Sequence, residues 1–307
     1  MRKFILCSTA YIIACFIQTP AISQYYFYNE DYLESALTWE FGLSLGGMNC
    51  LTDLGGKKGT GGKFIKDINW STTQPCGSLY AGANYRNIIG ARLELSFGQV
   101  KASDQVLIND RSEAHARFMR HLNFRTNIRE LAFSIECYPF LIIKPDRETM
   151  PLINLYIFAG IGSFSFRPET FYNNTWLNIS DLHTEGQGFA EYPGRKAYKL
   201  TQLNMPVGLG IKYEVSPILI FHIEIQYRKL WTDYLDDVST NYIDPALFKH
   251  YFTDAKANLA AKLADRRLNR DPSFNRIPGD IRGNNKNNDA YFSGIIKIGF
   301  ILGRQKR

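Results

Sequence analysis

The chain has 307 residues, including 18 Tyr, 21 Phe and 24 Gly. A composition so rich in aromatic residues and glycine is typical of many strands and argues against a soluble helical protein. The formal net charge is +7, yet no run of Lys or Arg is long enough to indicate a nucleic-acid-binding tail. We therefore expect no nucleic acid partner, and we expect the basic excess to face anionic lipid head groups.

The first 23 residues predict a signal peptide. Arg2 and Lys3 supply its positive start, residues 4–17 form the apolar stretch, and Ala21 and Ser23 provide a small-x-small cleavage site. We therefore expect export, with residues 24–36 as a short N-terminal segment of the mature chain.

The string Ile12-Ile13-Ala14-Cys15 also resembles a lipobox, so a lipoprotein is an alternative, although it leaves the cleavage site unexplained. No later segment reaches the roughly 18 uninterrupted apolar residues of a membrane-spanning helix. An exported chain without such a helix is either a soluble protein outside the cytoplasm or a membrane barrel.

Apolar and polar residues alternate with a period of two in many segments after residue 36. In Leu37 to Leu45, for example, Trp39 and Phe41 share one face while Thr38 and Glu40 share the other. The expected strands are 37–45, 79–86, 91–97, 130–138, 155–166, 207–214, 221–228 and 291–302. These eight strands predict an all-β fold, an antiparallel β-barrel over residues 37–302, followed by a short periplasmic tail over residues 303–307.

A soluble β-sandwich or lipocalin-like barrel would alternate in the same way. The connections favour a transmembrane barrel, because long and short loops alternate along the chain as they do between the two sides of the outer membrane. The long, extracellular loops are expected at 51–76, 101–128, 168–203 and 232–289, and the short, periplasmic ones at 87–90, 142–151 and 215–217.

The polar faces of these strands carry charges of both signs, which would be costly in a soluble core but belong in the lumen of a membrane barrel. Because side chains fill the interior of an eight-stranded barrel, the sequence predicts a salt-bridged plug, with a narrow channel as the alternative. The expected lumen charge network is Glu40, Arg92, Glu94, Glu136, Lys212, Glu224, Arg228 and Lys297, and Arg86 and Glu214 are expected to face inward as well.

Two features are expected at the outer rim of the barrel. Cys50 ends the first strand and Cys76 precedes the second, which favours a disulfide in an exported protein, the alternative being two free thiols. In the longest loop, Asp244-Pro245 is a helix start signal, and the spacing that follows predicts one external helix within Ala246 to Arg270.

No motif indicates catalysis, a cofactor or a metal. The glycine-rich stretch from Gly55 to Lys63 lacks the Ser or Thr that follows the lysine of a phosphate-binding loop. The histidines form no evident arrangement with a nucleophile, so we expect a protein that is not an enzyme. One acidic cluster could offer oxygen ligands to Ca²⁺, but its spacing matches no calcium loop, and we expect rim hydrogen bonds and arginine pairing instead. Its members are Asp233, Asp236, Asp237 and Asp244.

Three groups of residues carry a resemblance to a known family. They are Thr184-Glu185-Gly186-Gln187-Gly188, then Thr232-Asp233-Tyr234-Leu235-Asp236-Asp237 with Val238-Ser239, and Arg282-Gly283-Asn284 with Asn288-Asp289. Together they resemble a family of outer-membrane β-barrels that includes the PorG-type component of the type IX secretion system, over roughly residues 37–302. The long first loop with two cysteines and the helical insert in the last loop depart from that family.

The resemblance implies a structural component without catalysis in the outer membrane of a Gram-negative bacterium. Its expected partners are outer-membrane lipid and periplasmic subunits of a secretion ring. The leading hypothesis is therefore a non-catalytic barrel that anchors or assembles a type IX-like secretion system. The alternative is a surface barrel that binds a ligand or partner through its extracellular loops, and a lipid-modifying enzyme is a third hypothesis.

Overall fold

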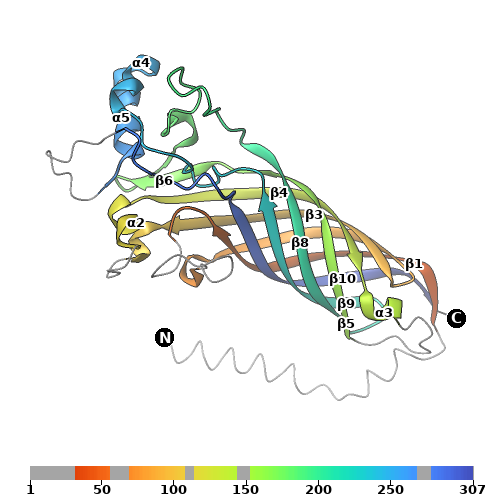
Figure 1. Cartoon of the computed structure of the whole chain (residues 1–307). Coiled ribbons are helices and arrows are strands. Elements are labelled where there is room, and N and C mark those ends of the chain that lie inside the picture. Colours follow the sequence, from red (N-terminus) through yellow and green to blue (C-terminus); the bar gives the residue numbers. More distant parts are fainter. Residues whose placement is uncertain (1–31, 56–68, 108–113, 144–152, 268–277, 307) are drawn as a thin grey trace, which may run out of the picture.

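The computed structural model describes residues 32–55, 69–107, 114–143, 153–267 and 278–306, and the predicted signal peptide lies outside these ranges. Eight antiparallel strands form the barrel: β1 (Tyr32–Leu51), β2 (Gln74–Tyr85), β3 (Ile89–Ser103), β4 (Asn123–Cys137), β5 (Ile153–Ser165), β8 (Thr201–Glu214), β9 (Leu219–Leu230) and β10 (Ala290–Lys306). Around the barrel they follow the order β3-β2-β1-β10-β9-β8-β5-β4, and pairing of β3 with β4 closes the sheet (Figure 1). The predicted eight-stranded closed barrel is confirmed.

The outward face of the barrel is an apolar belt to which all eight strands contribute. Large side chains that alternate along the strands are exposed, among them Leu45 at 70 %, Ile153 at 63 % and Ile223 at 61 %. The inward side chains over the same stretch are mostly polar or charged and are buried. An exposed apolar surface of this extent marks a surface covered by lipid, and turning apolar residues outward and charges inward is the arrangement of a transmembrane barrel. The soluble sandwich and the soluble barrel are thereby excluded.

At the outer end of the barrel this alternation inverts. On β3 and β4 the inward residues become apolar and form a buried core that includes Val100, Phe124 and Ile128, whereas outward positions carry polar residues such as Lys101 and Arg129. A strand that leaves lipid and enters water must exchange its two faces in this way. The inversion explains why the sequence pattern predicted strands shorter than β3 and β4.

The chain ends of the barrel also extend beyond the predicted bounds. β1 begins at Tyr32 and β10 continues to Lys306, so part of the expected N-terminal segment and most of the expected tail are paired strand. Each of the eight strands is accordingly long enough to cross the membrane at the usual tilt.

The connections at the end where β10 terminates are short. Arg86 and Asn87 turn the chain between β2 and β3 with φ of 49° and 54°, and helix α3 (Pro139–Ile143) follows β4. The expectation that Arg86 faces the lumen is wrong, because the turn places its side chain in an exposed position. Glu214 closes β8 and is only half-buried there. Short turns identify this end as the periplasmic one.

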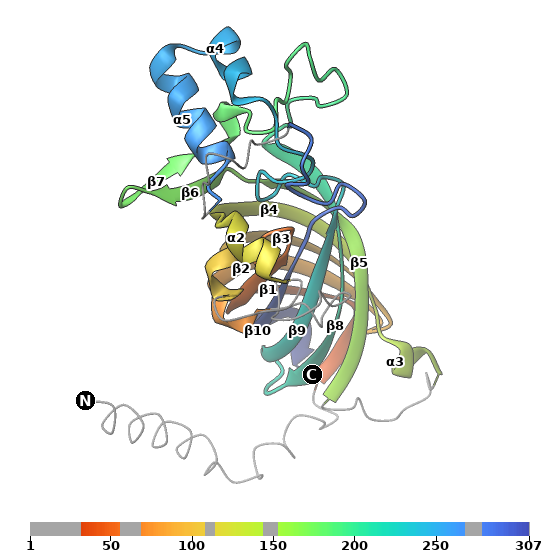
Figure 2. The ribbon, with the colours of Figure 1, turned by 60° about the vertical axis from the view of Figure 1, so that its left-hand side comes forward.

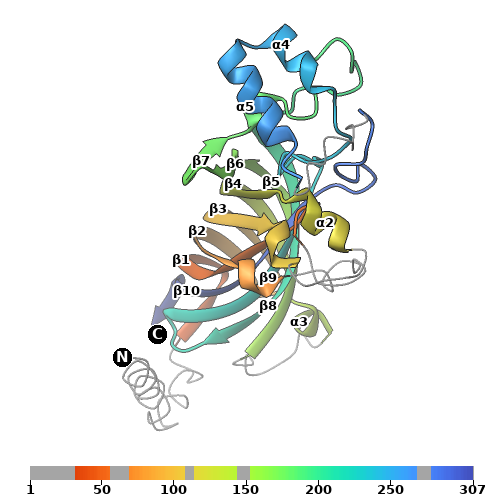
Figure 3. The same cartoon turned by 90° about the vertical axis from the view of Figure 1, so that its left-hand side faces the viewer.

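The opposite end carries the long loops and all the remaining elements, as Figures 1 and 3 show. These are η3 (Trp70–Thr72), η4 (Asp104–Leu107), α2 (Ala114–Arg120), the hairpin of β6 (Pro168–Tyr172) and β7 (Thr175–Asn178), η5 (Ser180–Leu182), η6 (Pro245–Leu247), α4 (Phe248–Tyr251) and α5 (Asp254–Ala264). No helix among the described residues is long and apolar enough to cross a membrane.

The single helix predicted in the longest loop is present as three short pieces. Its start is confirmed, since the Asp244 carboxylate accepts a hydrogen bond from the Ala246 amide at 2.9 Å. The helix is broken at Phe252 and Thr253, which both adopt extended backbone angles. Phe252 there packs against His183 and Phe189 of another loop, a contact that lies outside any local helical pattern.

Candidate functional site

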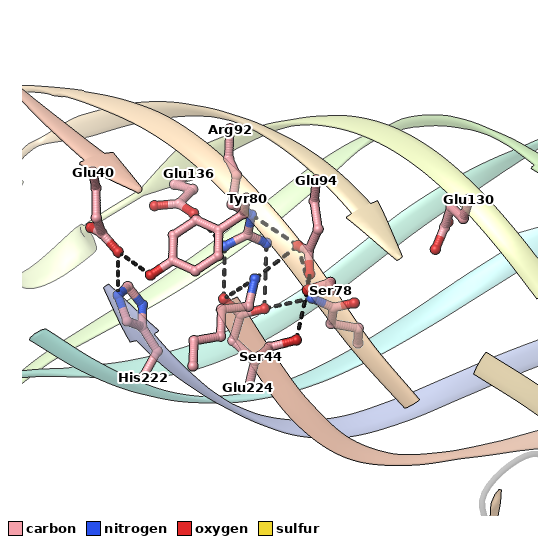
Figure 4. Close-up of polar contacts among 12 residues, drawn as sticks. Glu40, Ser44, Ser78, Tyr80, Arg92, Glu94, Glu130, Glu136, His222 and Glu224 are labelled. Atoms are coloured by element: carbon pink, nitrogen blue, oxygen red, sulfur yellow. Dashed lines mark hydrogen bonds and ion pairs between the residues drawn. The ribbon is translucent and has the colours of Figure 1, made fainter. Parts of the chain in front are cut away.

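The barrel lumen near the periplasmic end is built around Glu40 on β1. Its carboxylate lies 2.9 Å from Lys212 Nζ on β8 and 2.6 Å from His222 Nε2 on β9. The hydroxyl of Tyr80 on β2 donates a third hydrogen bond at 2.6 Å. Figure 4 shows the Tyr80 and His222 side chains converging on this carboxylate. Four strands are thereby joined across the lumen.

The middle of the lumen is organised by Arg92 on β3. Its guanidinium contacts three carboxylates, those of Glu94 at 3.2 Å, Glu136 at 2.5 Å and Glu224 at 2.7 Å. Lys297 on β10 reaches two of the same groups, Glu94 at 2.8 Å and Glu224 at 3.1 Å. Because each cation faces more than one carboxylate, the charges form a network and not separate pairs (Figure 4).

A third cluster lies toward the outer end of the lumen. Arg228 Nε on β9 pairs with Glu130 on β4 at 3.1 Å and its Nη1 donates to Ser293 at 2.5 Å. The Asn204 amide donates to the same Glu130 carboxylate at 2.6 Å and also contacts the Tyr291 hydroxyl. The eight charges predicted for the lumen all take part in this network.

Glu130 and His222 also join the network, although the predicted set of lumen charges did not include them. Both stand on the inward face by strict alternation, and Glu130 was the first residue of a predicted strand, so the period of two could have identified it. Lys297, Tyr291 and Tyr156 are all completely buried in the lumen. The lumen is therefore packed with side chains at these levels, which favours the plug over the channel.

The outer end of the barrel is covered by a compact assembly of loops, residues 166–200, 231–267 and 278–289, which we call the cap (Figure 2). It has an apolar core of its own, with Phe248 and Ala260 completely or almost completely buried. The ring of Phe189 stacks on that of Tyr251 with centroids 3.9 Å apart. The cap is thus an ordered unit and not a set of independent loops.

The first of the resembling strings, residues 184–188, supplies the acceptor at the centre of the cap. The Glu185 carboxylate accepts hydrogen bonds from the Ser239 amide at 3.0 Å and the Thr240 amide at 2.8 Å. It also pairs with Arg282 Nη1 at 2.8 Å. Gly186 and Gly188 have φ of 73° and 83°, which suits glycine, and their amides donate to the carbonyls of His183 and Arg195.

The second string, residues 232–239, meets the first directly. Thr184 Oγ1 donates to Asp237 Oδ2 at 2.6 Å, and the Tyr198 hydroxyl donates to Asp237 Oδ1 at 2.7 Å. Arg282, from the third group, donates to the Asp237 carbonyl at 2.7 Å. Residues that the sequence marked by resemblance therefore form the interior of the cap, which is a structural role.

Four carboxylates of this region lie close enough to repel one another, although Arg120 lies near two of them: Asp53, Asp233, Asp236 and Asp289. Burial, reinforced by the neighbouring Asp53 carboxylate, raises the pKa of Asp233 to about 9. Burial likewise raises the pKa of Asp236 and of Asp289 well above the ordinary range, and their mutual repulsion adds to the shift. Oδ2 of Asp233 is buried without a hydrogen-bond partner. The cluster consequently holds protons more tightly than exposed carboxylates do.

No metal site is formed by these or other groups in the part of the chain that the structure describes, since no three His, Cys, Asp or Glu side chains are suitably arranged. Three histidines make defined contacts: His121 contacts Gln105 at 3.2 Å, His183 stacks on Phe252, and His222 lies in the lumen network. Within the described residues none of them is hydrogen-bonded to a Ser or Cys side chain. In that part of the chain these three histidines therefore form no pair with a serine or cysteine nucleophile.

The disulfide predicted between Cys50 and Cys76 is wrong, because both thiols are free. The register of β1 and β2 places Cys76 opposite Gly46, four residues before Cys50. Four residues of strand span about 13 Å, whereas a disulfide needs Cα atoms within about 7 Å. The prediction failed because β2 begins at Gln74, earlier than the alternating pattern indicated.

An open cleft of about 770 Å³ lies at the outer surface between α2 and residues 279–284. Arg117, Arg120, Arg267 and Arg282 line it together with Asp53 and Asp280. Arg120 is fixed by Asp104 at 2.9 Å, and Arg267 by Asp265 at 2.9 Å. Ile281 at the rim is 80 % exposed. The cleft is accordingly an open hollow whose lining combines these charged residues with Met119 and Tyr242.

No family model matches the chain, and no curated protein matches it. Solved structures that resemble it include the Yersinia pestis attachment invasion locus protein Ail, crystallised with the heparin analogue sucrose octasulfate, at 8 % identity and a TM-score of 0.35, covering 88 % of this chain and 100 % of that chain. A major outer membrane protein of Thermus thermophilus is similar at 11 % identity and a TM-score of 0.36, covering 86 % and 99 %. The outer membrane protein OprG of Pseudomonas aeruginosa is similar at 9 % identity and a TM-score of 0.34, covering 88 % and 97 %.

Likeness at these scores is too distant to bear on function. The chain is nevertheless a transmembrane β-barrel of the outer-membrane type, on the evidence of its own lipid-facing belt, charged lumen and unequal loops.

Proposed function

We propose that the protein is a non-catalytic barrel of the outer membrane that acts as a binding platform through its extracellular cap. The observation that carries this proposal is the cap itself, whose loops are locked together by the contacts of Glu185 and Arg282. A surface fixed in advance loses little entropy when a partner binds. On the periplasmic side, the structure describes short turns and helix α3.

The packed lumen supports the same proposal. Glu224 and Lys297 are almost completely buried within the network, so transport through the barrel would require several ion pairs to break. The ordered extracellular surface is instead formed by the cap and by the cleft beside Ile281.

The test is photo-crosslinking from two exposed positions in the full-length protein, in intact cells. A photoreactive residue in place of Ile281 probes the cleft, and one in place of Ile143 on α3 (72 % exposed) probes the periplasmic side. The proposal expects a discrete adduct from position 281 that disappears when Glu185→Gln loosens the cap. Adducts from position 143 alone would contradict it.

A component of a type IX-like secretion system is the second candidate. It is favoured by the resembling strings, because residues 184–188 and 232–237 meet in the cap interior and so define the cap's architecture. This candidate expects that deletion of the protein abolishes export of secreted cargo, and that Ile143 crosslinks to periplasmic ring subunits. Normal export after deletion removes it.

A further inference from the structure

The outward face of β3, β4 and β5 changes from apolar to polar or basic toward the outer end of the barrel. On β3 the last exposed apolar residue is Phe97, on β4 it is Leu131 and on β5 it is Ile161. Beyond these residues the outward positions hold polar and basic side chains. Four of them form what we call the outer basic patch: Lys101, Arg125, Arg129 and Arg167.

Strand register places two of these cations side by side. Lys101 is the direct partner of Arg125 across β3 and β4, and Arg129 is flanked by Phe97 on one side and Ser165 on the other. Like charges directly opposite each other on a sheet are destabilising. Glu169 neutralises Arg125 at 2.8 Å, so Lys101 is the member of this pair that can bind an anion from outside the chain.

The protein itself supplies little negative charge to the patch. Arg125 pairs with Glu169 at 2.8 Å and lies over the Trp176 ring at 4.1 Å. Lys101, Arg129 and Arg167 have exposed side chains and take part in no ion pair within the described residues. Four cations less one carboxylate leave a local charge of +3.

The patch occupies one side of the barrel only. On β1, β2 and β10 the outward residues toward the outer end carry no charge: Leu45, Gly47, Pro75, Gly77, Phe292 and Gly294. On β9 the outward Lys229 is also exposed toward the outer end, but its cross-strand neighbours are Met205 and Ala290, so the four cations of the patch form the cluster above one sector of the belt.

We infer that the outer basic patch binds the phosphate groups of a lipid in the outer leaflet, whose acyl chains lie against the belt below. The same strands that carry the cations expose Leu95, Phe97 and Leu131 to lipid. Arg129 stands level with Phe97, at the boundary between the two surfaces. One lipid can therefore contact the basic patch with its phosphate groups and the apolar belt with its acyl chains. Guanidinium groups bind phosphate through paired, charge-assisted hydrogen bonds.

The test compares lipids retained by the purified, folded full-length barrel in native mass spectrometry. The probes are lipid A carrying two phosphates and the same lipid with both phosphates removed. The wild-type protein is expected to retain the phosphorylated lipid in preference to the dephosphorylated one. This preference should fall as the salt concentration rises from about 50 to about 500 mM, because salt screens interactions between exposed charges. The triple variant Lys101→Gln, Arg129→Gln, Arg167→Gln should lose about ten-fold or more of the preference.

A matched control removes the same number of charges elsewhere, as Lys229→Gln, Lys249→Gln, Lys262→Gln. All three of these lysines are exposed and lie outside the patch. Folding of every variant is checked by the faster migration of the unheated barrel on a denaturing gel. Undiminished preference in the triple variant overturns the inference, as does equal retention of the two lipids by the wild type or an equal loss in the control.

Discussion

Removal of the Arg92 guanidinium tests whether the lumen network stabilises the barrel. Arg92→Met keeps much of the side-chain volume but leaves Glu94, Glu136 and Glu224 without the cation that all three contact. Breaking one buried ion pair costs roughly 3–5 kcal/mol. Since Arg92 is only 3 % exposed and serves three carboxylates, we expect a loss at the upper end of that range, about 5 kcal/mol.

The measurement is the free energy of unfolding in urea, followed by tryptophan fluorescence in lipid vesicles. Glu224→Gln and the double variant complete a mutant cycle, in which the two sites should couple by more than about 1 kcal/mol because they share one contact. Lys229→Gln is the control, since an exposed outward lysine should change stability by less than about 0.5 kcal/mol. An Arg92→Met barrel that unfolds within about 1 kcal/mol of the wild type would refute the idea that the network stabilises the fold.

Three further predictions concern the outer end. The raised pKa values of Asp233 (about 9) and Asp237 (about 7) mean that the folded cap binds protons more tightly than the unfolded chain, so its free energy of unfolding is greatest below about pH 4, the ordinary pKa of aspartate, and falls as pH rises from there through 7 to 9. Hydrogen exchange across the cap, corrected for intrinsic rates, should quicken over that range, and Asp233→Asn should flatten the change. Glu185→Gln should destabilise the cap by about 3 kcal/mol and open it to protease while the barrel stays intact, so equal protease resistance would count against the proposed centre of the cap. Alkylation of the unfolded chain without reductant should modify both Cys50 and Cys76; a chain lighter by two hydrogen atoms in which neither cysteine is alkylated would show that the disulfide forms.

The barrel and its lumen could be predicted from the sequence because both depend on a period of two. Alternation alone assigns Arg92 and Glu224 to the inward face, and closure then brings inward charges from different strands within contact distance. The alternation does not determine which residues of neighbouring strands pair with each other. Cys50 and Cys76 therefore seemed adjacent in the sequence pattern, but the pairing of β1 with β2 separates them by four residues.

The cap was beyond the reach of periodicity for a different reason. Glu185 contacts residues 239 and 240 and Arg282, more than 50 and more than 90 positions away, and no local pattern encodes such contacts. The string around Glu185 could be noticed only through its resemblance to a family. Its role as the acceptor at the centre of the cap emerged from the geometry.

The contacts between the extracellular loops limit how the sequences of these loops can evolve. Where each loop of a barrel stands alone, one loop can be lengthened, shortened or exchanged while its neighbours keep their shape. Here Arg120 donates to carbonyls of residues 53 and 282, so that segments from three separate loops share one side chain. Sequence changes in these three segments must therefore compensate one another, or else be limited to loop tips that make no contact with Arg120. An inserted epitope tag would be tolerated only at such tips.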